Sequence, residues 1–118
     1  MPVTTASPAA LERKRELEAE LKRIVKILIE RYRPEKIILF GSLATGEVGE
    51  WSDIDLCIIK ETDKRPLDRE LEVTRLVDQN LAADFFVYTP GEFAASQDHY
   101  FIRDEILGRG KVLYDAGH

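Results

Sequence analysis

FGSLATGEVGEWSDIDL, residues 40–56, joins two apolar runs and determines how the rest of this chain is arranged. The run before it, Lys36–Phe40, has β-branched residues at its centre, and the run after it, Ile54–Ile59, is apolar apart from Asp55. Both patterns are typical of strands. Because side chains alternate between the two faces of a strand, we expect Asp53 and Asp55 to project from the same side.

Two features of this stretch indicate its chemistry. Carboxylates about 7 Å apart along a strand can bind the same hard cations. The Gly41-Ser42 bend at the end of the first strand offers backbone N–H groups and a hydroxyl to phosphate oxygens. A phosphate-binding bend beside metal-binding carboxylates is the arrangement used in phosphoryl and nucleotidyl transfer.

The remaining sequence predicts helices alternating with strands. Ser7-Pro8 has the pattern of a helix start, and Pro34 ends the long helix that runs from there to about Tyr32. A second long helix is expected from Pro66 to about Asn80. Its expected inner stripe consists of Leu67, Leu71, Thr74 and Leu81. The other expected elements are a helical turn over 43–46, a strand over Ala83–Tyr88, broken helical structure over 91–108 and a short strand over Lys111–Tyr114.

This order predicts an α/β (α+β) fold, with a small mixed sheet and helices packed mainly on one face. The link between the first two strands is about a dozen residues, too short for the usual helical crossover between parallel strands, so the sheet should not be wholly parallel. The continuous apolar run at 54–59 indicates an interior strand. The length predicts a single domain over residues 1–118, with residues 1–7 disordered.

Composition excludes some functions. The formal net charge is −5, which argues against binding a nucleic-acid polymer, because phosphate backbones need a basic face. A nucleotide remains possible, since metal ions and a few local donors can balance its charge. No apolar run approaches the roughly 20 residues of a membrane span. The one cysteine, Cys57, cannot form an internal disulfide, and the N-terminus lacks a leader pattern, so we expect a cytoplasmic protein.

Gly41-Ser42 followed at this spacing by Ser52-Asp53-Ile54-Asp55-Leu56 resembles the nucleotidyltransferase superfamily that includes DNA polymerase beta. The resemblance is closer to its small stand-alone members, the minimal nucleotidyltransferases. Asp84, at the start of the strand over Ala83–Tyr88, matches the third aspartate of the family pattern. The resemblance covers roughly residues 20–115, and it implies the nucleotidyltransferase fold.

The resemblance also implies roles for these residues. Asp53 and Asp55 would hold two Mg²⁺ ions, and Asp84 would complete the metal shell and take a proton from the acceptor hydroxyl. Gly41 and Ser42 would hold the outer phosphates of ATP or another nucleoside triphosphate, and Thr45 lies in the same nucleotide-binding turn. The implied reaction is transfer of a nucleoside monophosphate, AMP from ATP, to a hydroxyl group.

Minimal nucleotidyltransferases often pair with a HEPN-domain protein as antitoxin and toxin, and some attach AMP to a tyrosine of that partner. The resemblance therefore implies a HEPN-type protein partner as acceptor, and a homo-oligomer is also possible. Thr45 stands where the family usually has arginine, so this chain lacks one positive charge near the phosphates. An alternative is an antitoxin with weak or no catalysis that neutralises its partner by contact. A third is an acidic α/β domain unrelated to nucleotides.

Other residues have two interpretations each. Lys60 could reach a phosphate and supply the charge that Thr45 lacks, or it could be a solvated strand end. Trp51 could stack on a base or contact a partner, or it could pack over its own loop. Cys57 is expected to be buried and unreactive. His99 and His118 have no metal-ligand spacing.

Overall fold

The structure is a computed structural model that describes residues 7–117. It begins with a long helix, α1 (Pro8–Ile27), which continues as the π-helical segment η1 (Leu28–Tyr32). The Ser7 hydroxyl accepts a hydrogen bond from the Ala10 N–H (3.1 Å), so the predicted helix start is confirmed. Arg33, with a left-handed φ of 57°, ends the helix where the sequence predicts. The disorder expected for residues 1–6 lies outside the described residues, whereas Ser7 is held by its cap.

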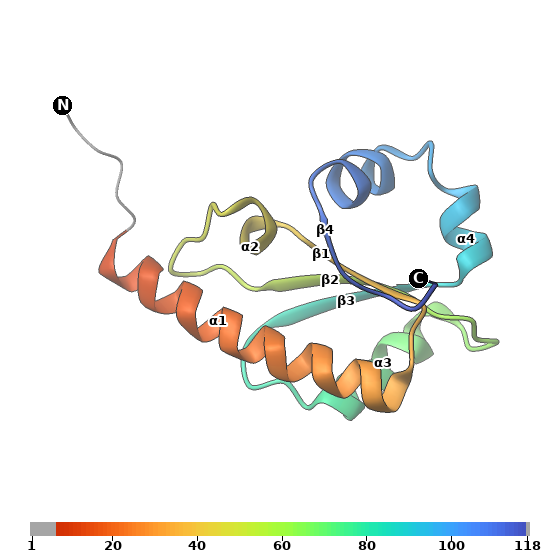
Figure 1. Cartoon of the computed structure of the whole chain (residues 1–118), viewed down its shortest axis with the longest axis horizontal. Coiled ribbons are helices and arrows are strands. Elements are labelled where there is room, and N and C mark those ends of the chain that lie inside the picture. The colour runs from red at the N-terminus through yellow and green to blue at the C-terminus, as the bar shows by residue number, and fades with distance from the viewer. Residues whose placement is uncertain (1–6, 118) are drawn as a thin grey trace.

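Four strands form one sheet in the order β3-β2-β1-β4 (Figure 1). Their bounds are β1 Lys36–Phe40, β2 Ile54–Ile59, β3 Ala83–Tyr88 and β4 Lys111–Asp115. β1 is antiparallel to both β2 and β4, whereas β2 and β3 are parallel. The predicted mixed sheet is confirmed, and β2 lies in its interior as expected. The short helix α2 (Ser42–Thr45) follows β1 directly.

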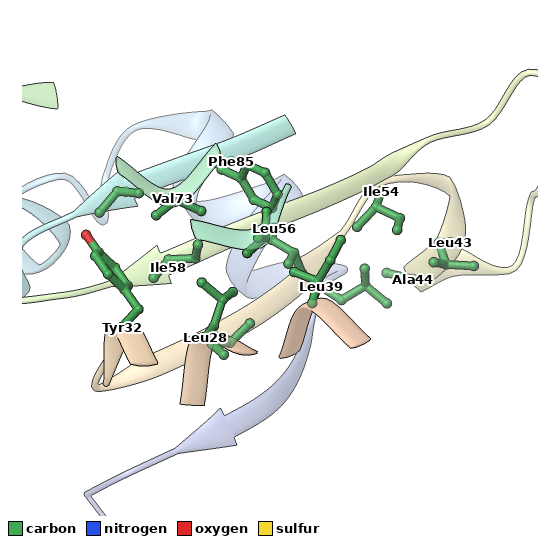
Figure 2. Packing of buried hydrophobic residues seen from close by; sticks show 14 of the residues in the cluster. Leu28, Tyr32, Leu39, Leu43, Ala44, Ile54, Leu56, Ile58, Val73 and Phe85 are labelled. Carbon is green, nitrogen blue, oxygen red and sulfur yellow. The ribbon is translucent and has the colours of Figure 1, made fainter. Parts of the chain in front are cut away.

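Helices cover the two faces of the sheet unequally (Figure 1). α1 and α3 (Pro66–Val77) cover one face, where side chains from β1, β2 and β3 such as Leu39, Leu56 and Phe85 are buried (Figure 2). α4 (Pro90–Ala95) and η2 (Phe101–Gly108) cover the other face with a smaller layer that contains Cys57 and Ile106. The prediction of helices mainly on one face is confirmed. None of the helices within residues 7–117 combines the length and apolar character needed to cross a membrane.

α3 packs with a different face from the one predicted. Leu67 and Leu71 are 66% and 41% exposed, and Thr74 is exposed as well. The buried residues of α3 are instead Arg69, Val73 and Val77, spaced four residues apart. The predicted inner stripe is therefore wrong for its three helical members, because the helix packs on Val73 and Val77 and buries Arg69 with them. Leu81, the fourth member, packs partly against the core after the helix has ended.

Arg69 joins α3 to α4. Its guanidinium forms a two-point pair with Glu92, at 2.7 Å and 3.1 Å. It also donates to the carbonyl oxygens of Lys64 (2.7 Å) and Val87 (3.3 Å). Glu92 in turn caps α4, because its carboxylate accepts from the Thr89 N–H at 2.9 Å. A buried arginine is stable here because nearly all of its donors are used.

A second ionic contact joins α1 to the end of α3. The Glu20 carboxylate is buried, and it accepts hydrogen bonds from Arg23 (2.8 Å and 2.9 Å) and from the Asn80 backbone N–H. Arg23 also donates to the carbonyl oxygens of Val77 (2.9 Å) and Asp78 (3.2 Å). α3 therefore ends at Val77, earlier than predicted, because Asp78 turns to a left-handed φ of 45° and Arg23 binds the terminal carbonyls.

This contact makes stability depend on pH. The hydrogen bond from Arg23, with further help from Asn80, lowers the pKa of Glu20 from 4.5 to about 2. The stabilisation is complete above pH 4.5 and is lost as the pH falls toward 2. We expect Glu20→Gln to lower the free energy of unfolding by about 2–3 kcal/mol at pH 7, and by about half as much at pH 3.

Urea unfolding of both proteins at the two pH values measures this difference. Glu18→Gln, which changes an exposed acid on the same helix, is the matched control and should shift the free energy of unfolding by less than about 0.5 kcal/mol. A loss for Glu20→Gln that is the same at pH 7 and pH 3 would contradict the charge-dependent origin.

Candidate active site

The direction of the strands brings the predicted site residues to one edge of the sheet. β1 runs antiparallel to β2, so the Gly41-Ser42 bend at its end lies beside the start of β2. β2 and β3 are parallel, so they start at the same edge, and Asp55 and Asp84 are direct neighbours in the register. One carboxylate oxygen from each of Asp53, Asp55 and Asp84 lies within 4.8 Å of the other two. The three predicted acids therefore form one cluster.

Asp55 lies at the centre of this acid cluster. Burial, together with the charges of Asp53 and Asp84, raises its pKa from 3.8 to about 6. Three oxygen donors that repel one another when ionised are the ligand type that a hard divalent cation stabilises. The donor set therefore fits a metal such as Mg²⁺, although exposed acids also occur together without one.

Gly41 is required at its position for two reasons. Its φ of 77° lies in the left-handed region, which side chains other than glycine rarely adopt. A Cβ atom at this position would also collide with the carboxylate of Asp55. The backbone at the end of β1 thus passes directly against one acid of the cluster, and any larger residue would have to displace that carboxylate.

α2 places Ser42 and Thr45 beside this bend. The Thr45 and Ala44 N–H groups donate to the Gly41 carbonyl (3.2 Å and 3.1 Å), and the Gly46 N–H donates to the Ser42 carbonyl (2.9 Å). The Thr45 hydroxyl also donates to the Ser42 carbonyl at 3.3 Å. No hydrogen bond within residues 7–117 occupies the Ser42 hydroxyl, so it is free to contact a ligand.

No sequence pattern indicates the residue that anchors the loop before Asp53. The Ser52 hydroxyl accepts from the Gly49 N–H (2.9 Å), which closes the loop into a tight turn. Arg13 of α1 donates to the Ser52 carbonyl at 2.9 Å and fastens this turn to the helix. Arg13 is one of many charged residues on α1, so no pattern distinguishes it from its solvated neighbours.

The structure distinguishes between the interpretations that the sequence allows for several single residues. The Lys60 ammonium donates to the Tyr32 carbonyl (2.7 Å) at the opposite end of β2, so it does not replace the charge that Thr45 lacks. Trp51 is 88% exposed, so the interpretation that it packs over its loop is wrong.

Cys57 is fully buried, and burial raises the pKa of its thiol to about 12, which agrees with an unreactive core residue. His99 stacks on exposed Tyr100, away from any acid cluster found among the described residues.

The raised pKa of Asp55 predicts how the metal-free protein responds to pH. The ionised carboxylate destabilises the folded state; this cost is absent below about pH 3.8, grows toward pH 6 and is complete above it. In EDTA we expect Asp55→Asn to raise stability by about 1–2 kcal/mol at pH 8, a value reduced for solvent screening of this half-buried group, and to change it little at pH 4.

Thermal unfolding at the two pH values checks this, with the exposed acid Asp63 changed to asparagine as the control. Millimolar Mg²⁺ should reverse the order at pH 8, because only the unaltered chain retains all three carboxylates and ligand binding stabilises the folded state. If Asp55→Asn were less stable than the unaltered chain at pH 8 in EDTA, the ionised Asp55 carboxylate would not be destabilising the fold.

Comparison with known proteins agrees with this geometry. The nucleotidyltransferase domain family matches residues 21–115. A Methanocaldococcus jannaschii protein with the name "putative protein adenylyltransferase" is 46% identical over 100 residues, which span 82% of this chain and 97% of that protein. A crystal structure of a "putative nucleotidyltransferase" from Sulfolobus solfataricus has the same fold, with a TM-score of 0.67 at 20% identity over 98% of this chain and 95% of that one. This chain belongs to the nucleotidyltransferase domain family.

Proposed function

We propose that this chain is a Mg²⁺-dependent nucleotidyltransferase that transfers AMP from ATP to a hydroxyl group on a partner protein. The observation that carries the proposal is the convergence of Asp53, Asp55 and Asp84 beside the Gly41 bend. The similarity to a protein with the name of an adenylyltransferase supports a protein acceptor. A HEPN-domain protein is the proposed partner, by the resemblance to minimal nucleotidyltransferases.

The three acids have distinct roles in this proposal. Asp53 and Asp55 would hold two Mg²⁺ ions, and Asp84 would share in holding one of them. When bound, the metal supplies charge neutralisation at the phosphates and at the attacking oxygen. A new bond forms between the acceptor oxygen and the α-phosphorus, the bond from the α-phosphorus to the bridging oxygen breaks, and pyrophosphate leaves. Asp84 takes the proton that the acceptor hydroxyl releases.

The bend positions the nucleotide. The Ser42 hydroxyl and the backbone of Gly41 and Ser42 would bind the outer phosphates, and the Thr45 hydroxyl could add a contact from the same turn. Neutral donors hold phosphate oxygens but cancel none of their charge. With Lys60 at the far end of β2, nucleotide affinity should therefore depend strongly on the metal ions, or on a cation from the partner protein.

The acceptor has room to approach along β3. Asp84 is the most exposed acid of the cluster and lies on the edge strand of the sheet. A cavity of about 250 Å³ lies beside it, lined in part by Glu70, Thr74 and Phe86. A hydroxyl side chain entering from this edge would meet Asp84 before the other two acids. Exposed Trp51, in the loop before Asp53, offers a second contact for the same partner.

A contact-dependent antitoxin remains the second candidate, because Thr45 cannot supply the positive charge that arginine gives in related enzymes. The acid cluster argues for the enzyme. Burial of Asp55 beside two further carboxylates raises its pKa and destabilises the fold, a cost without benefit unless the site binds metal. The two candidates differ in whether the partner becomes covalently labelled.

The first test of the enzyme is nucleotide binding. We expect isothermal titration calorimetry to detect ATP binding that requires Mg²⁺ and is lost from the acid cluster in EDTA, because without metal the ionised acids repel the phosphates. The double variant Asp53→Asn with Asp55→Asn should weaken Mg²⁺-dependent ATP binding by at least about tenfold, which corresponds to about 1.4 kcal/mol. Asp63→Asn, at an exposed loop position, should leave it unchanged. Equal affinity for the double variant and the unaltered chain would argue against this site.

The second test is transfer. Incubation with α-³²P-ATP, Mg²⁺ and a HEPN-domain protein encoded in the adjacent reading frame should label that protein. γ-³²P-ATP should leave it unlabelled, which distinguishes adenylylation from phosphorylation. Asp53→Ala should reduce the initial rate of labelling at least about 100-fold, in the range typical for removal of a group that stabilises transition-state charge.

Asp63→Ala serves as the matched control for loss of an acid, and its rate should be unchanged. Labelling by Asp53→Ala at the normal rate would move the chemistry to another site. Stable complex formation without any label would favour the contact-dependent antitoxin.

A further inference from the structure

A cavity of about 670 Å³ lies at the end of the sheet opposite the acid cluster. It is formed between η1, which contributes Arg31 and Tyr32, and α3, which contributes Asp68, Glu72 and Arg75. η1 precedes the start of β1, whereas the Gly41 bend follows its end, so about the length of a strand separates the cavity from the proposed nucleotide site. The two sites are therefore distinct.

The charges around this cavity favour an anion. Three cations line it, and one of them, Lys64, is paired with Glu72 at 2.9 Å. Arg31 and Arg75 form no ion pair within residues 7–117, and Asp68 is the one further acid in the lining. Two arginines without an ion pair in the described chain thus line the same cavity. Guanidinium groups bind oxyanions through two parallel hydrogen bonds, so they suit phosphate or carboxylate groups.

Tyr32 provides an independent indication of a ligand. Its side chain is 5% exposed, and its hydroxyl has no hydrogen-bond partner in the described part of the chain. Figure 2 shows the hydroxyl end of Tyr32 on the same side of its ring as Val73 of α3, and Tyr32 itself lines the cavity. Buried hydroxyl groups almost always have a partner, so an orphan one beside a cavity points to a group that the cavity binds.

The protonation and the position of Tyr32 are both fixed. Burial raises the pKa of its hydroxyl to about 12, so it remains a hydrogen-bond donor at neutral pH. The Lys60 ammonium lies 5.0 Å from the centre of the ring and also donates to the Tyr32 carbonyl. The ring belongs to a π-helical segment, a geometry that recurs at functional sites. The donor is therefore held in place before any ligand arrives.

We propose that this cavity is a second binding site, for a small phosphorylated molecule, with Arg31, Arg75 and the Tyr32 hydroxyl as donors to the phosphate. The cavity volume lies within the range of small-molecule sites and exceeds what one phosphate group fills. Leu71, which α3 leaves 41% exposed at its rim, offers an apolar contact for the remainder of the molecule. The site would work without metal, unlike the acid cluster.

Titration calorimetry in EDTA tests this proposal, because without metal the acid cluster repels anions and binding there is suppressed. The probes are inorganic pyrophosphate, which has phosphate groups alone, and AMP, which adds an organic part. We expect saturable binding of one equivalent, weakened at least about tenfold by Arg31→Ala or by Arg75→Ala, a loss of about 1.4 kcal/mol. Tyr32→Phe should weaken binding several-fold without lowering the melting temperature, since it removes only the unpaired hydroxyl.

Two controls make the result specific. Arg15→Ala removes an exposed arginine from the same helix and should leave binding unchanged. Asp53→Asn alters the acid cluster and should also leave it unchanged. No binding of either probe at 10 mM (about the weakest useful affinity) would overturn the proposal. So would full binding by the Arg31→Ala, Arg75→Ala double variant, loss of binding in Asp53→Asn, or equally tight binding of citrate, which has carboxylates in place of phosphates.

Discussion

The close approach of Asp53 and Asp84 to the half-buried Asp55 is the constraint around which this small fold is organised. The carboxylate oxygens are held within 4.8 Å of one another, and burial together with the charges of Asp53 and Asp84 raises the pKa of the central Asp55 to about 6. A chain cannot reduce this cost by moving one acid away, because the direct pairing of β2 with β3 fixes Asp55 beside Asp84. The stabilising contacts must therefore come from elsewhere in the molecule.

Those contacts lie between the helices. Glu20 with Arg23 joins α1 to the end of α3, and Arg69 with Glu92 joins α3 to α4. Both pairs are charge-assisted, and in each pair one side chain is buried, so the surrounding hydrogen bonds keep it satisfied. Neither pair touches the acid cluster. The molecule thus separates a destabilised edge, which is available for ligand binding, from a rigid set of helices that holds the strands in register.

Local patterns and chain direction predicted the strands and the shared side of Asp53 and Asp55, whereas Asp84 was expected at the site only from the resemblance to the nucleotidyltransferases. Alternation within 54–59 and the short link before it are enough to place Asp53, Asp55 and the Gly41 bend at one edge. The orientation of α3 could not be predicted in this way. Leu67 and Leu71 have helical spacing, but the buried face carries Val73 and Val77 with Arg69, whose partner Glu92 lies on a different helix. The role of Arg13, and the orphan hydroxyl of Tyr32, depend on similarly distant contacts.

The positive charge that Thr45 does not supply affects both nucleotide binding and partner binding. In a site with an arginine at this position, the protein itself would balance part of the phosphate charge. Here the nearest alternative in the sequence, Lys60, is engaged with the end of η1. In the proposed function, the described chain would thus provide the ligands for metal and the bend for phosphate, but no assigned cation between them. An enzyme built in this way gains most from a partner that brings both the acceptor hydroxyl and a positive charge to the same edge of the sheet. Nucleotide binding and partner binding would then stabilise each other, because each supplies charge that the other requires.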